Sequence, residues 1–150
     1  MNIQIGSVCS GTMRSEDLIP TFLGFLINLD TEKEFTSVIR EGKSIIIQAE
    51  KDDSVWDSEN TIMYLNEDLW EAMDSFSPDY CFFGAHPGNG SDYGYWPMED
   101  IEDEFDGLKV SDLSEVPEDY KGNHVLLIND HGNITLYKTV MTLKEEWGIV

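Results

Sequence analysis

The sequence predicts an α+β fold, in which an N-terminal strand and two to three helices pack on a mostly antiparallel C-terminal sheet with a short acidic helix. Apolar residues recur at helical spacing in the first half of the chain, whereas short apolar runs separated by turn residues dominate the second half. Aromatic residues make up 11% of the 150 residues, which supplies the bulk for a packed core. We therefore expect a single compact α+β domain over residues 1–150.

The start of the chain predicts a strand followed by a core helix. Residues 2–9 alternate polar and apolar side chains, which is typical of a strand with one buried face. Ser15 precedes two acidic residues, and we expect it to cap a helix over 16–29 with Pro20 in its first turn. The apolar stripe of this helix contains Leu18, Phe22, Phe25, Leu26 and Leu29.

Two further helices are expected before residue 80. The first runs from Thr31 to about residue 50, although three consecutive isoleucines leave 43–50 open between helix and strand. The second spans 58–76, with Ser58 as its cap. Its buried face is expected to contain Ile62, Leu65, Leu69 and Met73.

A strand, a loop and a second strand are predicted next. Residues 80–83 are apolar and predict a buried strand, 84–94 predict a Gly-rich loop, and 95–96 resume a strand. Pro97 then begins a short helix that Gly107 closes. Its inward residues are expected to be Met98, Ile101, Phe105 and Leu108.

The C-terminal part predicts a hairpin. Two apolar runs, 125–128 and 134–137, flank the turn residues 129–133. Residues 146–150 are expected to add a last strand.

Acidic residues are concentrated in the middle of the chain, which carries a formal net charge of −21. The 57 residues between Lys51 and Lys109 contain 16 Asp or Glu and no Lys or Arg, whereas the rest of the chain has 14 acids and 9 bases. A local excess of one sign predicts a surface that meets a partner of the opposite sign. Because such a surface repels nucleic acid and anionic lipids, we expect no direct nucleic-acid binding and no membrane association.

The apolar run and the cysteines indicate a cytoplasmic protein. The run from Leu18 to Leu29 is too short to span a bilayer and follows acidic residues instead of a basic leader. Cys9 and Cys81 are therefore expected to be reduced and buried. A nucleophilic cysteine would need a cation to lower its pKa, and acidic surroundings do the opposite.

Metal and catalytic patterns are weak. His86, His124 and His131 have neither the spacing of a metal-binding helix nor a Cys-x-x-Cys pair beside them. We expect no metal, no cofactor and no enzymatic activity. The alternative is a metal- or small-molecule-binding protein or enzyme that uses the Gly-rich loop from His86 to Asp92, with Arg14 as an anion-binding group. This loop lacks the Lys-Ser/Thr ending of a phosphate-binding loop. A purely structural interpretation is a tight turn between strands with glycines at positive φ.

Two predicted helices present acidic faces without basic residues among them, and these acids are the candidate partner-binding residues. In the first set are Glu99, Asp100, Glu102, Asp103, Glu104 and Asp106, and in the second Glu67, Asp68, Glu71 and Asp74. Ordinary exposed helices carry Lys or Arg that pair with such acids. Carboxylates one helical turn apart repeat at about 5.4 Å, the scale of phosphate spacing along a nucleic-acid strand.

Two segments carry a resemblance. The residues Gly11-Thr12-Met13-Arg14-Ser15-Glu16-Asp17-Leu18-Ile19-Pro20 and Phe83-Gly84-Ala85-His86-Pro87-Gly88-Asn89-Gly90-Ser91-Asp92-Tyr93-Gly94-Tyr95-Trp96 resemble those of a family of small acidic proteins carried by bacteriophages and other mobile elements. No settled activity comes with that family, so the resemblance implies context and no catalytic residue. In size and charge the chain is also similar to anti-restriction and anti-CRISPR proteins that imitate DNA.

The charge and the resemblance lead to one expected function. We expect a phage-type inhibitor that evades host defence by occupying the basic groove of a nucleic-acid-binding protein, such as a host nuclease. An acidic globule without a charge-directed partner is the third interpretation.

Overall fold

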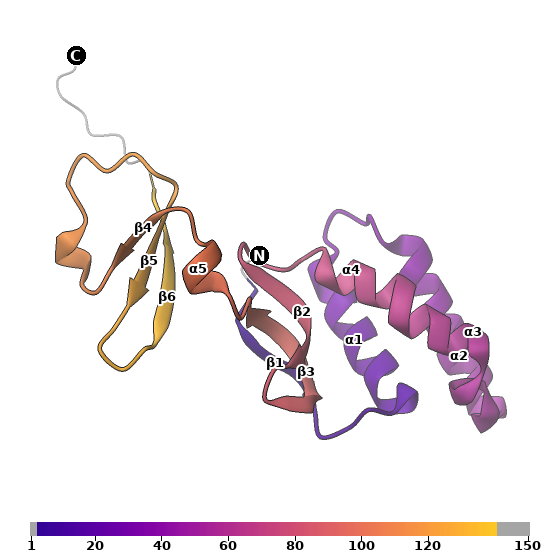
Figure 1. Cartoon of the computed structure of the whole chain (residues 1–150). Helices are drawn as coiled ribbons and strands as arrows, with labels where there is room; N and C mark the ends of the chain where they lie inside the picture. The colour runs from indigo at the N-terminus through magenta and orange to yellow at the C-terminus, as the bar shows by residue number, and fades with distance from the viewer. Residues whose placement is uncertain (1–2, 141–150) are drawn as a thin grey trace, which may run out of the picture. The chain divides into compact units, whose positions relative to one another are not determined.

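The computed structural model describes residues 3–140. The chain divides into two compact units, one ending at Ile101 and the other beginning at Glu102 (Figure 1). The single compact domain expected over 1–150 stays a prediction. The α+β class is confirmed, since helices and two small, mostly antiparallel sheets make up the described chain.

The first unit contains three strands and a helical layer. In chain order its elements are β1 (Gly6–Ser10), α1 (Ser15–Leu29), α2 (Thr36–Lys51), a 3₁₀ turn (Asp53–Asp57), α3 (Glu59–Met63), a π-helical turn (Tyr64–Leu69), α4 (Trp70–Asp74), β2 (Cys81–His86) and β3 (Asn89–Pro97). α3, the π turn and α4 follow one another without a break and form one helix, which we call the long helix. The strands form an antiparallel sheet in the order β1-β3-β2, and the helices pack against it (Figure 1).

Aromatic side chains join the helices to this sheet. Phe22 of α1 and Trp70 of α4 both meet Phe83 of β2 edge-on, with ring centroids 5.1 and 5.0 Å apart. Tyr95 of β3 is fully buried and donates a hydrogen bond to the carbonyl oxygen of Met73 at 2.7 Å. The core of the first unit therefore lies between α1, the long helix and the central strand.

The central strand β3 lies close to β1. Gly94 sits opposite Ser7, and a Cβ at Gly94 would collide with the carbonyl oxygen of Gly6. A larger residue would push β1 away, so glycine is required here for close backbone approach.

The second unit contains a small sheet. α5 (Ile101–Glu104) begins at the last residue of the first unit and is followed by β4 (Leu108–Val110), a 3₁₀ turn (Leu113–Glu115), β5 (His124–Ile128) and β6 (Ile134–Lys138). β4 pairs with β5 in parallel, and β6 pairs with β5 antiparallel. The expected hairpin around 129–133 is confirmed, with the Asn129 side chain accepting hydrogen bonds from the backbone amides of His131 and Asn133. The strand expected over 146–150 lies outside the described residues.

Two helix starts differ from expectation. α1 begins at Ser15 with Arg14 in the cap position, so Pro20 lies in the second turn instead of the first. α2 begins at Thr36 and not near Thr31. The reason is the buried side chain of Asp30, which accepts hydrogen bonds from the backbone amides of Glu34 and Phe35 and holds the preceding residues in a turn.

The ambiguous stretch 43–50 is helical and belongs to α2. Gly42 lies within this helix, at a position where a Cβ would collide with the hydroxyl of Tyr64 and the side chain of Leu23. Tyr64 is buried and donates a hydrogen bond to the carbonyl oxygen of Val38 at 2.8 Å. Gly42 thus lets the long helix pack closely on α2.

The long helix is confirmed with Ser58 as its cap, but one of its expected core residues is wrong. The Ser58 hydroxyl accepts a hydrogen bond from the Thr61 amide at 3.3 Å. Ile62 is 42% exposed, whereas Thr61 is buried. The π turn at Tyr64–Leu69 adds a residue to the turn and rotates the buried face relative to a regular α-helix.

Two further corrections concern residues 84–108. The expected Gly-rich loop over 84–94 is instead a tight hairpin in which Pro87 and Gly88 connect β2 and β3. The helix expected from Pro97 to Gly107 is the single turn α5, because Pro97 ends β3 and Leu108 begins β4. Met98, expected inside, is 42% exposed.

Candidate functional site

The acids of the long helix form the helical patch, which we define as Glu67, Asp68, Glu71 and Asp74. The π turn supplies Glu67 and Asp68, and α4 supplies the other two. All four are exposed, and none makes an ion pair with a described residue. Glu67 and Glu71 stand four positions apart, so their carboxylates follow one another along the helix.

Asp74 differs from the other acids of the helical patch because its carboxylate is already engaged. Its Oδ1 atom accepts hydrogen bonds from the backbone amide of Phe83 at 2.9 Å and from the hydroxyl of Ser77 at 3.0 Å. These bonds join the end of α4 to β2. Asp74 is therefore first a structural residue, and sequence periodicity could not separate it from its neighbours.

The second set of acids forms the acidic segment, defined as residues 99–106. Its six carboxylates belong to Glu99, Asp100, Glu102, Asp103, Glu104 and Asp106, and all are exposed. The first two belong to the first unit and the other four to the second. Only 101–104 is helical, so a long acidic helix face is not present here.

The acidic segment makes no ion pair with a described residue. Within residues 3–140, Lys109 is a cation that contacts it, and its Nζ donates to the backbone carbonyl of Glu102 and not to a carboxylate. The described chain thus leaves the charge of these side chains to solvent and counterions.

Polar side chains of the hairpin from His86 to Asp92 form hydrogen bonds with other residues of the same hairpin. The Nδ1 atom of His86 accepts a hydrogen bond from the Gly88 amide at 2.9 Å, and its ring meets Trp96 edge-on at 4.6 Å. Asn89 accepts from both the amide and the hydroxyl of Ser91. The glycines of this hairpin do not have the positive φ that we expected.

Residues 3–140 hold no group of three or more His, Cys, Asp or Glu side chains placed to bind a metal ion. His124 begins β5 and His131 lies in the β5–β6 turn. The Oδ1 atom of Asp92 is buried and has no hydrogen-bond partner among the described residues. Metal or small-molecule binding at this hairpin stays a prediction.

The two cysteines are free and partly buried. Burial raises the pKa of the Cys81 thiol above its ordinary value, and the nearby carboxylate of Asp79 raises it further. A thiol with a raised pKa is a poor nucleophile at neutral pH, as the acidic surroundings predicted.

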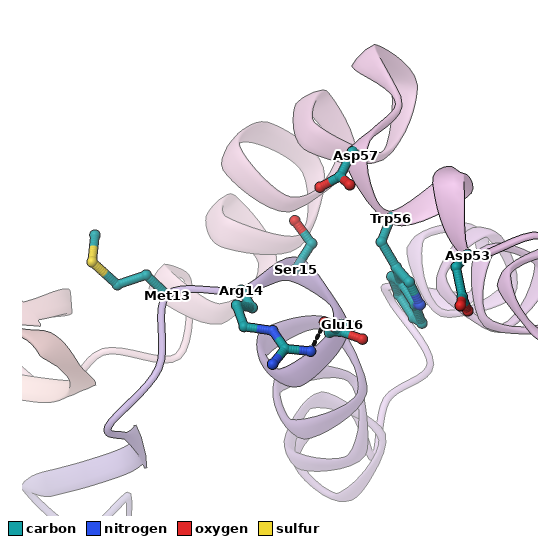
Figure 2. A pocket seen from close by; sticks show the side chains of 7 residues that line it. All are labelled: Met13, Arg14, Ser15, Glu16, Asp53, Trp56 and Asp57. Carbon is teal, nitrogen blue, oxygen red and sulfur yellow. Dashed lines mark ion pairs between the residues drawn. The ribbon is translucent and has the colours of Figure 1, made fainter.

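A pocket of about 360 Å³ lies between the start of α1 and the 3₁₀ turn (Figure 2). Its lining contains Met13, Arg14, Ser15, Glu16, Asp53, Trp56 and Asp57. Arg14 pairs with Glu16 in this pocket and with Asp17 at 3.6 Å. Its guanidinium is therefore neutralised by its own neighbours, and the three carboxylates of the lining disfavour the anion that the alternative interpretation assigned to Arg14.

A second concave surface adjoins the acidic segment. It has a volume of about 590 Å³ and is lined by Phe82, Ala85, Pro87, Met98, Glu99 and Asp100. We call it the hairpin groove. Sequence reasoning missed it because Met98 was assigned to the buried side of a helix, and the one available signal was Met98 standing directly before two acids.

Comparison of the chain with protein-family models, with curated proteins and with solved structures gave no match. In the described part of the chain, no helix has both the length and the apolar character needed to cross a bilayer.

Proposed function

We propose that the protein is a non-enzymatic, stoichiometric inhibitor that occupies the basic nucleic-acid groove of a host defence nuclease, of the anti-CRISPR or anti-restriction type. One observation carries this proposal. The ten candidate acids are all exposed, and none is paired with a cation among the described residues. A basic groove would supply the missing counter-charges.

The physical gain from such a complex has two sources. The acidic surface repels itself, and contact with Lys and Arg relieves that repulsion. The complementary fields also steer the encounter, which raises the association rate at low salt. Glu67 and Glu71, about one turn apart on the long helix, provide the spacing that approximates successive phosphates.

We propose different roles for the candidate acids. The carboxylates of Glu67, Asp68 and Glu71 in the helical patch are exposed and make no ion pair with a described residue, and they are proposed to face the partner. Asp74 is proposed to hold the patch in place through its bond to β2. The carboxylates of the acidic segment are proposed to form a second contact.

The test is an affinity capture from bacterial host lysate at two salt concentrations, read out by mass spectrometry. The wild type is compared with a variant that carries Glu99→Gln, Glu102→Gln, Asp103→Asn and Glu104→Gln. We expect a nucleic-acid enzyme to be captured by the wild type at low salt and to be depleted at high salt and with the variant.

A matched control removes four exposed acids from elsewhere. It carries Glu32→Gln, Glu34→Gln, Glu41→Gln and Glu50→Gln, which change the net charge by the same amount. If both variants captured less enzyme than the wild type and to the same extent, total charge and not the acidic segment would determine binding. Absence of any charge-dependent enzyme would contradict the proposed function.

A further inference from the structure

Apolar and acidic residues together line the hairpin groove. We call its apolar residues Phe82, Ala85, Pro87 and Met98 the apolar floor, and its acidic residues Glu99 and Asp100 the acidic rim. Met98 is 42% exposed and Phe82 is half-buried, so apolar atoms on this surface remain in contact with water. A ligand that covers them would gain the hydrophobic contribution of their burial.

Backbone hydrogen bonds hold the rim beside the floor. The amide of Met98 donates to the carbonyl of Tyr80 at 2.9 Å, and the amide of Ile101 donates to the carbonyl of Met98 at 3.1 Å. These bonds turn the chain back after β3, and the pairing of Cys81 with Pro97 anchors that turn to β2. The carboxylates of Glu99 and Asp100 thus extend from an ordered turn of the first unit.

No described residue that lines the groove is a Lys or Arg. All six lining residues fall within the stretch between Lys51 and Lys109 that contains no Lys or Arg. Neither Glu99 nor Asp100 makes an ion pair with a described residue. A purely apolar occupant would bury these carboxylates without compensation, which is unfavourable.

We propose that the hairpin groove receives a Lys or Arg side chain of the basic partner protein, with its aliphatic stem on Met98 and Phe82 and its charged end at Glu99 and Asp100. This inference rests on the proposed function and names the chemistry of one contact within it. Long basic side chains cover apolar surface with their methylene groups while the charged head stays at a polar rim. A guanidinium can also bond a carboxylate in bidentate fashion.

The acidic rim and the apolar floor should affect different rate constants of partner binding. Loss of the rim carboxylates should slow association, and the effect should shrink as salt is added. Loss of the apolar floor should speed dissociation with little dependence on salt. A purely electrostatic contact would show the first effect alone.

The first test uses butylguanidinium as the probe and the methionine methyl groups as reporters in NMR. The Met98 methyl signal is assigned by its loss in Met98→Leu, and that of Met63, which is 49% exposed on α3, serves as the internal control. We expect a saturable shift of the Met98 signal with butylguanidinium that is larger than the shift of Met63. The guanidinium ion, which has no stem, should shift the Met98 signal less.

The double variant Glu99→Gln and Asp100→Asn should weaken the apparent affinity for butylguanidinium about three- to fivefold. Equal shifts of Met98 and Met63, equal effects of guanidinium and butylguanidinium, or an unchanged affinity in the double variant would each overturn the groove assignment. This test needs no partner, so its failure is distinguishable from failure of the proposed function.

The second test uses the enzyme captured from lysate. Met98→Gln, a change at an exposed side chain, should raise the dissociation rate about threefold at both low and high salt. If the four-acid variant weakens binding while Met98→Gln leaves the dissociation rate unchanged, the groove inference fails and the proposed function survives.

Discussion

The carboxylate of Asp74 accepts a hydrogen bond from the backbone amide of Phe83 at 2.9 Å, and this bond joins the last turn of the long helix to the edge of β2. One acid of the helical patch therefore stabilises the surface on which the others are displayed. The helix and the sheet are further joined by Trp70 and Phe83, whose rings meet edge-on.

Replacing Asp74 by Ala removes the acceptor of two hydrogen bonds. We expect the free energy of unfolding to fall by about 1–2 kcal/mol, because the Phe83 amide loses its partner. Asp74→Asn keeps a side-chain oxygen and should lose less. Urea unfolding measures both, with Glu71→Gln as an exposed control; a D74A variant as stable as the wild type would show that the bond to β2 contributes nothing.

Replacing Gly94 by Ala should separate β1 from β3. The new Cβ would collide with the Gly6 carbonyl, and we expect a loss of about 2 kcal/mol or more in the free energy of unfolding. Gly24 in α1 is the matched control, since a Cβ there meets no other atom and Ala should stabilise the helix by about 0.5–1 kcal/mol. Thermal unfolding of the two variants should move in opposite directions, and equal shifts would contradict the packing described here.

Stability should fall at alkaline pH. Burial raises the pKa values of the Tyr64 and Tyr95 hydroxyls above the ordinary value near 10, with nearby carboxylates raising them further. The folded chain then holds these protons more tightly than the unfolded chain, so the stabilisation is complete below about pH 10 and declines as the pH rises above it.

Alkaline titration with phenolate absorbance and circular dichroism tests this expectation. The two buried tyrosines should ionise only as the protein unfolds. Tyr64→Phe should flatten the decline of stability above about pH 10 while losing the bond to Val38 at neutral pH. Ionisation of every tyrosine at an ordinary pKa in a folded protein would contradict the buried placement.

Added salt should raise the melting temperature. The net charge is −21, and counterions screen the repulsion among exposed acids over about 8–10 Å at physiological ionic strength. The four-acid variant of the acidic segment should melt higher than the wild type at low salt and approach it at high salt. Differential scanning calorimetry across NaCl concentrations measures this, and a flat or falling trend for the wild type would argue against concentrated repulsion.

Sequence patterns predicted the elements whose signals are local. The hairpin of β5 and β6 followed from apolar runs around turn residues, and the long helix followed from its spacing and the Ser58 cap. These features depend on residues within a few positions of one another, so no knowledge of the rest of the chain was needed.

The errors arose where distant residues decide the structure. Gly84 and Gly94 looked like loop residues, yet they pair within the β2–β3 hairpin, and Gly94 is needed for the approach of β1. Pro97 looked like a helix start but ends β3, because its partner Cys81 extends the sheet to that point. Likewise β4 gave no sequence signal, since its pairing with β5 joins segments separated by a long connection.

For the candidate site, the sequence predicted which acids are exposed but not how they are arranged. The acids are exposed as expected, but the acidic segment is only one helical turn, and Asp74 bonds to β2. The hairpin groove depends on the turn after β3, which brings Met98 beside Phe82. Periodicity within one helix could not reveal a surface lined by residues of β2, of the β2–β3 turn and of the turn after β3.

The central claim is tested most directly by competition for one enzyme. A labelled DNA or RNA is bound to the nucleic-acid enzyme captured from host lysate, and the fluorescence anisotropy is followed as the protein is added. We predict stoichiometric displacement that weakens with salt and with the four-acid variant of the acidic segment, while the four-acid control retains it. Nucleic acid that stays bound at saturating protein would contradict occupation of the basic groove.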